Sequence, residues 1–303
     1  MKLALGIKSD PVETRYSFEW LFDIAAKENI PYIQLGSFLE LYSLEDGYFE
    51  RLKKTAADFE VRIKSLFTAH RELGGFFYND AFMEKTARRN YERFIHVASV
   101  LGADYCGSNP GAVYRDRMET KEAGIRRYLF HMFELMHIAH ESGLKGLTIE
   151  PMSSMAEPPT TPGEMDRMLG ELRNYHKNNP GNTVPVYLCG DISHGLVDKN
   201  KRLCFDHLSL FSHGLPYMAE FHVKNTDALY NSTFGFSAEE VEKGVVDLEL
   251  TRRMIEDHRE KIPVGEFVGY LEIGGPKTGR DYTDPLLEQS IRNSLRAMRE
   301  AFI

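Results

Sequence analysis

Residues 219–224 read Ala-Glu-Phe-His-Val-Lys, and polar and apolar side chains alternate strictly after the alanine. Because successive side chains of a β-strand point to opposite faces, Phe221 and Val223 share one face and the polar residues share the other. The apolar face can pack against helices, which directs the polar face to the interior of a closed sheet. A strand of this kind is typical of a barrel that carries a reactive site at its end.

The same unit, a short strand followed by a longer helix, recurs along the whole chain. The candidate strands are 2–7, 32–35, 62–70, 103–108, 147–150, 184–191, 218–225 and 269–273, and the helical stretches include 18–27, 84–100, 121–141, 162–176, 239–260 and 284–302. Such alternation implies parallel strands with helical crossovers, and eight units favour a closed barrel over an open sheet. We therefore predict a single (β/α)8 TIM barrel domain over residues 1–303.

Composition excludes several classes of protein. Hydrophobic residues make up 42% of the 303 residues and charged residues 27%, as in an ordinary globular domain. A formal net charge of -8 argues against a nucleic-acid partner, although a local basic pocket could still bind a small anion. The apolar start at 1–7 is too short for a signal peptide or a membrane span, and three cysteines are an odd count for disulfides. These features predict a cytoplasmic protein without membrane contact.

Four consecutive candidate strands each end on a group that can bind a metal: Glu150, Asp191, His222 and Glu272. Because parallel barrel strands finish at the same end, we expect these groups to meet there. Taken singly, each is more simply a salt-bridged carboxylate or a core histidine. Together, three carboxylates and an imidazole suit Mn2+, Mg2+ or Co2+, and they suit structural zinc poorly because no thiolate is in line.

Short segments around these residues resemble one known superfamily. They read Thr-Ile-Glu-Pro at 148–151, Gly-Asp-Ile-Ser-His at 190–194, Phe-His-Val-Lys-Asn at 221–225 and Leu-Glu-Ile at 271–273. In order and spacing they resemble the xylose isomerase-like TIM barrel superfamily, and within it the branch of sugar-phosphate isomerases and ketose 3-epimerases. The resemblance implies an isomerase or epimerase of carbohydrate metabolism, and it is compatible with a homodimer.

The resemblance also implies roles for single residues. Glu150 and Glu272 would bind the metal and act as acid and base from opposite faces of the substrate. Asp191 and His222 would complete the ligand set, and His194 would contact the substrate. This fits the chemistry of a keto sugar, because a metal on the carbonyl and the adjacent hydroxyl stabilises an enediolate while carboxylates move the proton.

Basic residues near the end of the barrel suggest an anionic substrate. Residues 274–280 read Gly-Gly-Pro-Lys-Thr-Gly-Arg, so backbone N–H groups with Lys277 and Arg280 could bind an anion, as could the inward-pointing Lys224. The alternative is a flexible turn with solvated charges. The resembled epimerases carry an arginine six residues after the histidine ligand, whereas this chain has Ala228, which puts contacts to a free hexulose in doubt. We expect a keto sugar, a keto sugar phosphate or a sugar acid.

Two further features have open interpretations. His70, at the end of the third candidate strand, is either a substrate contact at the rim of the site or part of a surface pair with Arg71. The segment 225–237 follows the seventh candidate strand, and it predicts a substrate lid or a pocket wall.

Other functions compete with the isomerase. A metal-dependent decarboxylase of a 3-oxo sugar acid needs the same enediolate chemistry. A DNA-repair endonuclease of the same superfold needs more histidine ligands and a cationic groove. A sugar-binding protein without activity would have no use for a complete ligand set.

Overall fold

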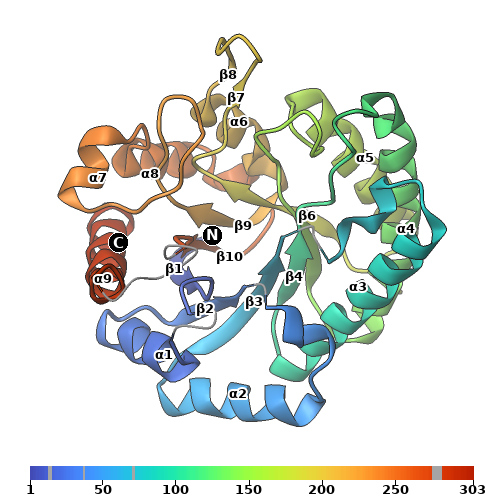
Figure 1. Ribbon diagram of the computed structural model, residues 1–303. Helices are drawn as coiled ribbons and strands as arrows, with labels where there is room; N and C mark the ends of the chain where they lie inside the picture. The colour runs from blue at the N-terminus through green and yellow to red at the C-terminus, as the bar shows by residue number, and fades with distance from the viewer. Residues whose placement is uncertain (13–15, 37, 70–71, 275–281) are drawn as a thin grey trace. The chain divides into compact units, whose positions relative to one another are not determined.

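The computed structural model describes residues 1–12, 16–36, 38–69, 72–274 and 282–303. Eight parallel strands close into a barrel in the order β1-β10-β9-β6-β5-β4-β3-β2, and helices surround it (Figure 1). The barrel strands are β1 (Lys2–Lys8), β2 (Tyr32–Leu35), β3 (Arg62–Thr68), β4 (Tyr105–Ser108), β5 (Gly146–Ile149), β6 (Val186–Asp191), β9 (Met218–Val223) and β10 (Glu266–Leu271). The predicted (β/α)8 TIM barrel is confirmed.

Helices alternate with these strands along the chain. They are α1 (Phe18–Lys27), α2 (Asp46–Asp58), α3 (Ala81–Leu101), α4 (Lys121–Glu141), α5 (Pro162–Asn178), α6 (His207–Gly214), α7 (Ala238–Lys243), α8 (Leu248–Asp257) and α9 (Asp284–Phe302). Short 3-10 turns are η1 (Leu39–Tyr42), η2 (Gly74–Phe77), η3 (Met118–Thr120), η4 (Leu215–Tyr217) and η5 (Arg259–Lys261). Within the described ranges, none of the helices is long and apolar enough to cross a lipid bilayer.

The chain differs from the sequence prediction in two local features. The single helix expected over 239–260 is two helices, because the backbone at Gly244 is extended and the Asp247 side chain accepts a hydrogen bond from Leu250 N to start α8. An additional antiparallel hairpin, β7 (Leu196–Val197) with β8 (Leu203–Phe205), follows β6. Strands of two and three residues are too short to produce a readable alternation.

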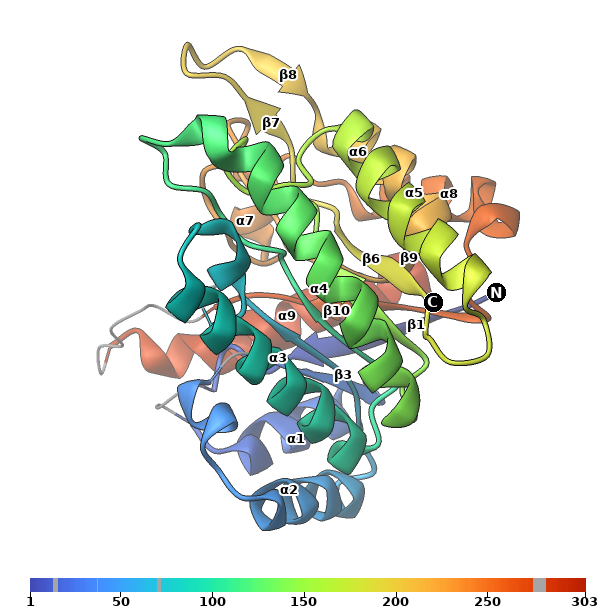
Figure 2. The same cartoon turned by 90° about the vertical axis from the view of Figure 1, so that its right-hand side faces the viewer.

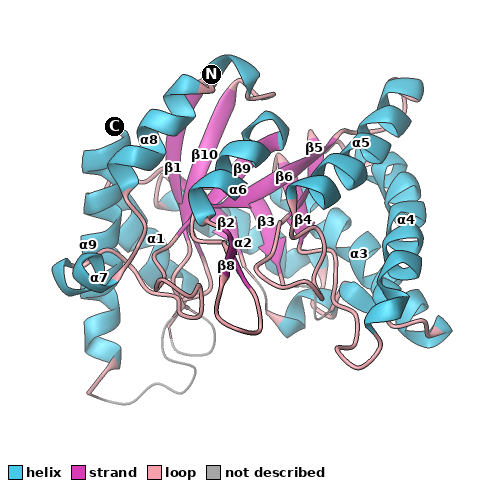
Figure 3. Cartoon of the chain, turned by 90° about the horizontal axis from the view of Figure 1, so that it is seen from above, coloured by secondary structure: helices cyan, strands magenta, loops and turns pink. Residues whose placement is uncertain are grey.

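The chain groups into two compact units. The first comprises Met1–Gly36, Arg51–Ile63 and Gly190–Ile303, and the second comprises Ser37–Glu50 and Lys64–Cys189. In the first unit β10 pairs in parallel with both β1 and β9, and β1 pairs with β2. Figure 3 shows β1, β10 and β9 as neighbouring strands, and α9 packs against β1 and α8.

The two faces of β9 separate as its sequence predicts. The Phe221 ring stacks on Phe267 of β10 at 4.7 Å between centroids, and it meets Phe302 of α9 at 6.1 Å. Gly269 allows this packing, because a Cβ there would lie 2.6 Å from Phe221 Cζ. His222 points the other way and is fully buried. The helix-facing and interior residues of this strand are therefore those that the alternation indicates.

In the second unit β3, β4, β5 and β6 follow one another as parallel neighbours. The register of the last pair sets Leu147 opposite Val186 and Ile149 opposite Leu188. Helices α3 and α4 lie side by side outside these strands (Figure 2). This register fixes the level at which each strand ends.

A group of ion pairs connects the end of α1 to α9. The Glu28 carboxylate accepts hydrogen bonds from Arg292 at 3.0 Å and from Arg296 at 2.7 and 3.0 Å. Hydrogen bonds from Arg296 chiefly hold the pKa of Glu28 below its ordinary value, although burial opposes them. Because an ionic hydrogen bond is lost, and water partly screens it at the half-exposed Arg296, we expect Glu28→Gln to lower the free energy of unfolding by about 1 kcal/mol at neutral pH.

The same substitution predicts a pH dependence. A carboxyl group whose pKa is lowered by folding stabilises the protein above its unfolded pKa, about 4.3, and this contribution fades as the pH falls below it. The difference between wild type and Glu28→Gln should therefore shrink towards pH 3. Urea denaturation at both pH values measures it, with Glu19→Gln on the exposed face of α1 as control. A difference that grew on acidification would contradict the assignment.

Candidate metal centre

Three of the predicted ligands meet in the first unit. Asp191 ends β6, His222 lies in β9 and Glu272 follows β10 directly. Each offers one ligand atom, and these atoms lie within 4.8 Å of one another. Asp191 and His222 are buried, and the Glu272 side chain is 13% exposed. The structure thus brings these three side chains together, and that they bind a metal stays a prediction.

The imidazole of His222 has a defined orientation. Its Nε2 lies 2.8 Å from Gln34 Oε1, at the end of β2, and both side chains are fully buried. Since a carbonyl oxygen can only accept, we assign a ring hydrogen to Nε2, so that the lone pair of the neutral ring lies on Nδ1. Nδ1 lies 3.5 Å from Glu272 Oε2, on the side of the other two candidate ligands. A metal-binding histidine typically donates its other ring N–H to an acceptor, as His222 does here to Gln34.

The two oxygens of Asp191 have separate environments. Oδ1 accepts from the Ser193 N–H and from Ser193 Oγ, each at 2.7 Å. Oδ2 lies 2.7 Å from Lys224 Nζ and 3.3 Å from His194 Nε2. Burial acts to raise the pKa of Asp191, but His194 and Lys224 outweigh it and lower the pKa. The carboxylate is thus anchored on one oxygen and faces the Lys224 ammonium group and the His194 ring with the other.

Glu272 lies between two lysines. Lys8 Nζ is 2.5 Å from Oε1, and Lys224 Nζ is 2.5 Å from Oε2. Burial acts to raise the pKa of Glu272, yet His222, Lys224 and Lys8 together hold it well below the ordinary range. The side chain is therefore an anion with an ammonium group on each oxygen.

Lys8 is a site residue that sequence reasoning missed. It ends β1, and its ammonium group also lies 2.8 Å from Asp10 Oδ2. Burial would lower the pKa of Lys8, but Asp10 and Glu272 outweigh it and raise the pKa. Alternation along β1 contained the clue, because Lys8 falls on the same face as Ala4 of the interior cluster.

Glu150 belongs to the second unit and directly follows β5, where it is buried. Ile149 lies opposite Leu188, so continuing the register sets Glu150 opposite Cys189. That Glu150 completes the ligand set stays a prediction. The predicted substrate contacts His70, Lys277 and Arg280 lie outside the described residues.

The segment 225–237 is closed by its own hydrogen bonds. Asn225 and Phe234 form an antiparallel bridge, with backbone hydrogen bonds of 2.8 and 3.1 Å. The Tyr230 hydroxyl accepts from His207 N at 3.2 Å, which ties the loop to the start of α6. Ala228 lies within this loop. That the segment 225–237 acts as a substrate lid or a pocket wall stays a prediction.

Comparison with known proteins identifies the family. The profile of the xylose isomerase-like TIM barrel family matches residues 22–265. The chain belongs to this family. Membership confirms the resemblance that the strand-end motifs indicate, and it supports an enzyme of the sugar isomerase and epimerase class. No curated protein matches the chain.

Solved structures of xylose isomerase-like barrels share the fold at low sequence identity. A Rhodospirillum rubrum protein with a provisional xylose isomerase assignment has a TM-score of 0.77 at 17% identity, with 99% of each chain covered. D-psicose 3-epimerase from Clostridium cellulolyticum has 0.73 at 14%, covering 100% of this chain and 99% of its own. The Escherichia coli 3-keto-D-glucoside 4-epimerase has 0.65 at 12%, covering 99% and 100%. At these identities the likeness establishes the fold alone.

The donor set of this xylose isomerase-like chain fits a divalent ion. Asp191 Oδ2 is buried without a hydrogen bond, although it pairs with Lys224, and the neutral His222 ring would offer its Nδ1 lone pair to an ion. Carboxylate oxygens with one imidazole nitrogen are ligands that Mn2+, Mg2+ and Co2+ accept. The residues present are therefore compatible with a metal ion.

The Gln34 contact gives a testable prediction. Gln34→Leu removes the acceptor that fixes the His222 ring, so Mn2+ affinity should fall by about 10- to 100-fold. Gln34→Glu keeps an acceptor at the same distance and should restore most of the affinity. Isothermal titration of the three proteins measures this. Equal Mn2+ affinities for the leucine variant and wild type would show that Gln34 does not support metal binding.

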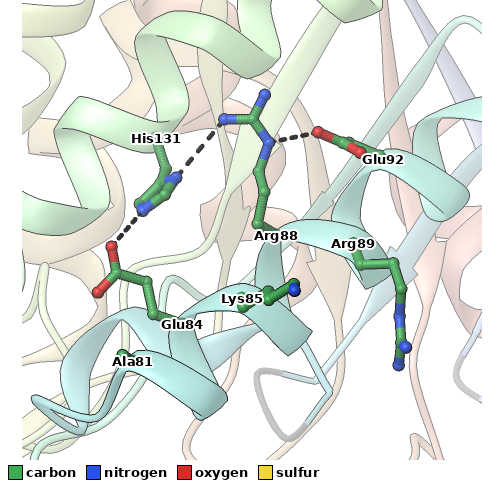
Figure 4. A pocket seen from close by; sticks show the side chains of 7 residues that line it. All are labelled: Ala81, Glu84, Lys85, Arg88, Arg89, Glu92 and His131. Atoms are coloured by element: carbon green, nitrogen blue, oxygen red, sulfur yellow. Dashed lines mark hydrogen bonds and ion pairs between the residues drawn. The ribbon is translucent and has the colours of Figure 1, made fainter.

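A surface hollow of about 510 Å³ on α3 and α4 contrasts with this centre (Figure 4). Side chains in the hollow are paired locally, since Arg88 donates to Glu92 at 2.6 Å and the His131 ring lies 2.7 Å from Glu84 Oε1. In Figure 4 Arg89 points away from Arg88, so their guanidinium groups do not converge. Nothing in this arrangement selects a ligand.

Proposed function

We propose that this protein is a divalent-metal-dependent isomerase or epimerase of a small keto sugar. In this proposal Glu150, Asp191, His222 and Glu272 hold the ion. The observation that carries the proposal is the convergence of Asp191, His222 and Glu272 within 4.8 Å, with His222 oriented by Gln34. Membership in the xylose isomerase-like family supports the sugar as substrate class.

The proposed roles follow from the chemistry of an α-hydroxy ketone. A bound ion would polarise the carbonyl and the neighbouring hydroxyl, which acidifies the adjacent C–H. Glu150 and Glu272 remove and return the proton, each from its own face of the substrate. His194, beside Asp191, binds a substrate hydroxyl. Return on the opposite face gives an epimer, and return at the neighbouring carbon gives an isomer.

We further propose that the substrate carries negative charge, as a sugar phosphate or a sugar acid. Lys224 and Lys8 concentrate two ammonium groups beside the candidate ligands. Lys277 and Arg280, outside the described residues, stay predicted contacts. Positive charge close to a small polar site favours an anionic ligand.

Incubation with tetruloses, pentuloses and hexuloses and their phosphates in D2O, in the presence of Mn2+, tests the proposal. We expect deuterium at the carbon next to the carbonyl of one substrate, with an epimerised or isomerised product. Release of CO2 from a 3-oxo sugar acid would instead identify the decarboxylase. Absence of exchange for every sugar, with metal bound, would refute an isomerase of keto sugars.

A further inference from the structure

The two lysines on Glu272 are not equivalent. Lys224 Nζ bridges two candidate ligands, at 2.7 Å from Asp191 Oδ2 and 2.5 Å from Glu272 Oε2. Lys8 Nζ contacts the other oxygen of Glu272, and it also contacts Asp10, which is outside the ligand set. The Lys224 ammonium group thus contacts both candidate ligands, whereas the Lys8 ammonium group contacts the other oxygen of Glu272.

A metal ion and the Lys224 ammonium group need the same two oxygens. Carboxylate ligands approach divalent ions to about 2.0–2.2 Å. A divalent ion and an ammonium group on the same two oxygens, Asp191 Oδ2 and Glu272 Oε2, would lie close together, and like charges this close repel strongly. The contacts of Lys8 with Glu272 Oε1 and Asp10 Oδ2 involve neither of these two oxygens.

We propose that Lys224 is an internal cation that a divalent metal displaces, and that the displaced ammonium group binds a negatively charged oxygen of the substrate. Lys8 stays in place as a positioning residue that turns Glu272 Oε2 toward the ion. The inference rests on the proposed metal site. It makes binding ordered, because the Lys224 ammonium group leaves Asp191 Oδ2 and Glu272 Oε2 for an anion only after the metal has bound.

Amine labelling tests the displacement directly. The Lys224 and Lys8 side chains are 12% and 6% exposed, so both should acetylate slowly in the metal-free protein. We expect Mn2+ to raise Lys224 labelling at least about fivefold, as measured by mass spectrometry, and to leave Lys8 protected. Glycolate, a small hydroxy acid, should protect Lys224 again in the metal-loaded protein only.

A pair of variants adds an equilibrium readout. Lys224→Met removes the competing cation, so Mn2+ should bind about tenfold more tightly. The control is Lys64→Met, which also removes a buried lysine, here paired with Asp104 at 2.9 Å, and should leave Mn2+ affinity unchanged. Circular dichroism confirms that both variants are folded.

The outcomes separate this inference from the proposed function. If Mn2+ does not bind wild type, the metal site fails and the inference fails with it. If Mn2+ binds but Lys224 stays protected, or Lys8 becomes reactive instead, only the displacement is overturned. If Lys224 is released but glycolate does not protect it, the role in substrate binding is overturned.

Discussion

Replacement of Glu150 by glutamine should reduce turnover by about 10²- to 10⁴-fold, even at metal concentrations that saturate the protein. Glu272→Gln should have an effect of the same size. The amide keeps the shape of each side chain and can still offer an oxygen to the ion, but it cannot accept the substrate proton. An epimerase needs one group on each face of the enediolate, so the loss of either should stop net conversion.

Solvent exchange distinguishes the two variants. Removal and return of the proton on one face need a single base, so one of the two should still exchange the substrate proton in D2O without net conversion. The control is Glu266→Gln, which lies at the opposite end of β10 and bonds Lys2 and Tyr32. Near-normal turnover in both variants with metal bound would make the glutamates ligands only. The base would then be sought at Lys224 or His194.

The fold was predictable because its evidence is repeated along the chain. Eight strand-helix units each carry a weak pattern, and closure into a barrel follows from their number. The alternation in 219–224 places His222 inside and Phe221 against the helices, as the packing of Phe221 on Phe302 confirms. By contrast, the break at Gly244 depends on one glycine and on the capping residue Asp247. When the sequence is read alone, the helical periodicity over 239–260 hides this local signal.

The partners of the ligands were less predictable than the ligands. Lys8 and Glu272 are 264 residues apart in sequence, and His222 and Gln34 are 188 apart. The pairing depends on which strands become neighbours when the sheet closes, since β10 lies between β1 and β9. A strand-end motif names a residue that can bind a metal, but it does not tell which residue from a distant strand will orient or neutralise it.

Asp191 is the residue whose change should most affect the ion itself. Ser193 anchors Oδ1 by two hydrogen bonds, so an asparagine can keep the position of the side chain through its carbonyl oxygen. The group that then faces Lys224 and His194 is an uncharged amide, which is a donor and cannot bind a cation. Metal affinity should therefore fall by at least about 100-fold, beyond the loss expected for an outer partner such as Gln34.

Isothermal titration with Mn2+ measures the effect of Asp191→Asn, and turnover at very high metal concentration shows whether activity recovers. Partial recovery is expected, because the proton-transfer groups Glu150 and Glu272 are unchanged. The matched control is Asp198→Asn in the turn between β7 and β8, where the carboxylate bonds the N–H groups of Asn200 and Arg202 at 2.7 and 2.9 Å. That variant should bind Mn2+ as wild type does. An Asp191→Asn protein with wild-type affinity would show that the ion, if bound, does not use Oδ2, and both the ligand set and the displacement of Lys224 would have to be abandoned.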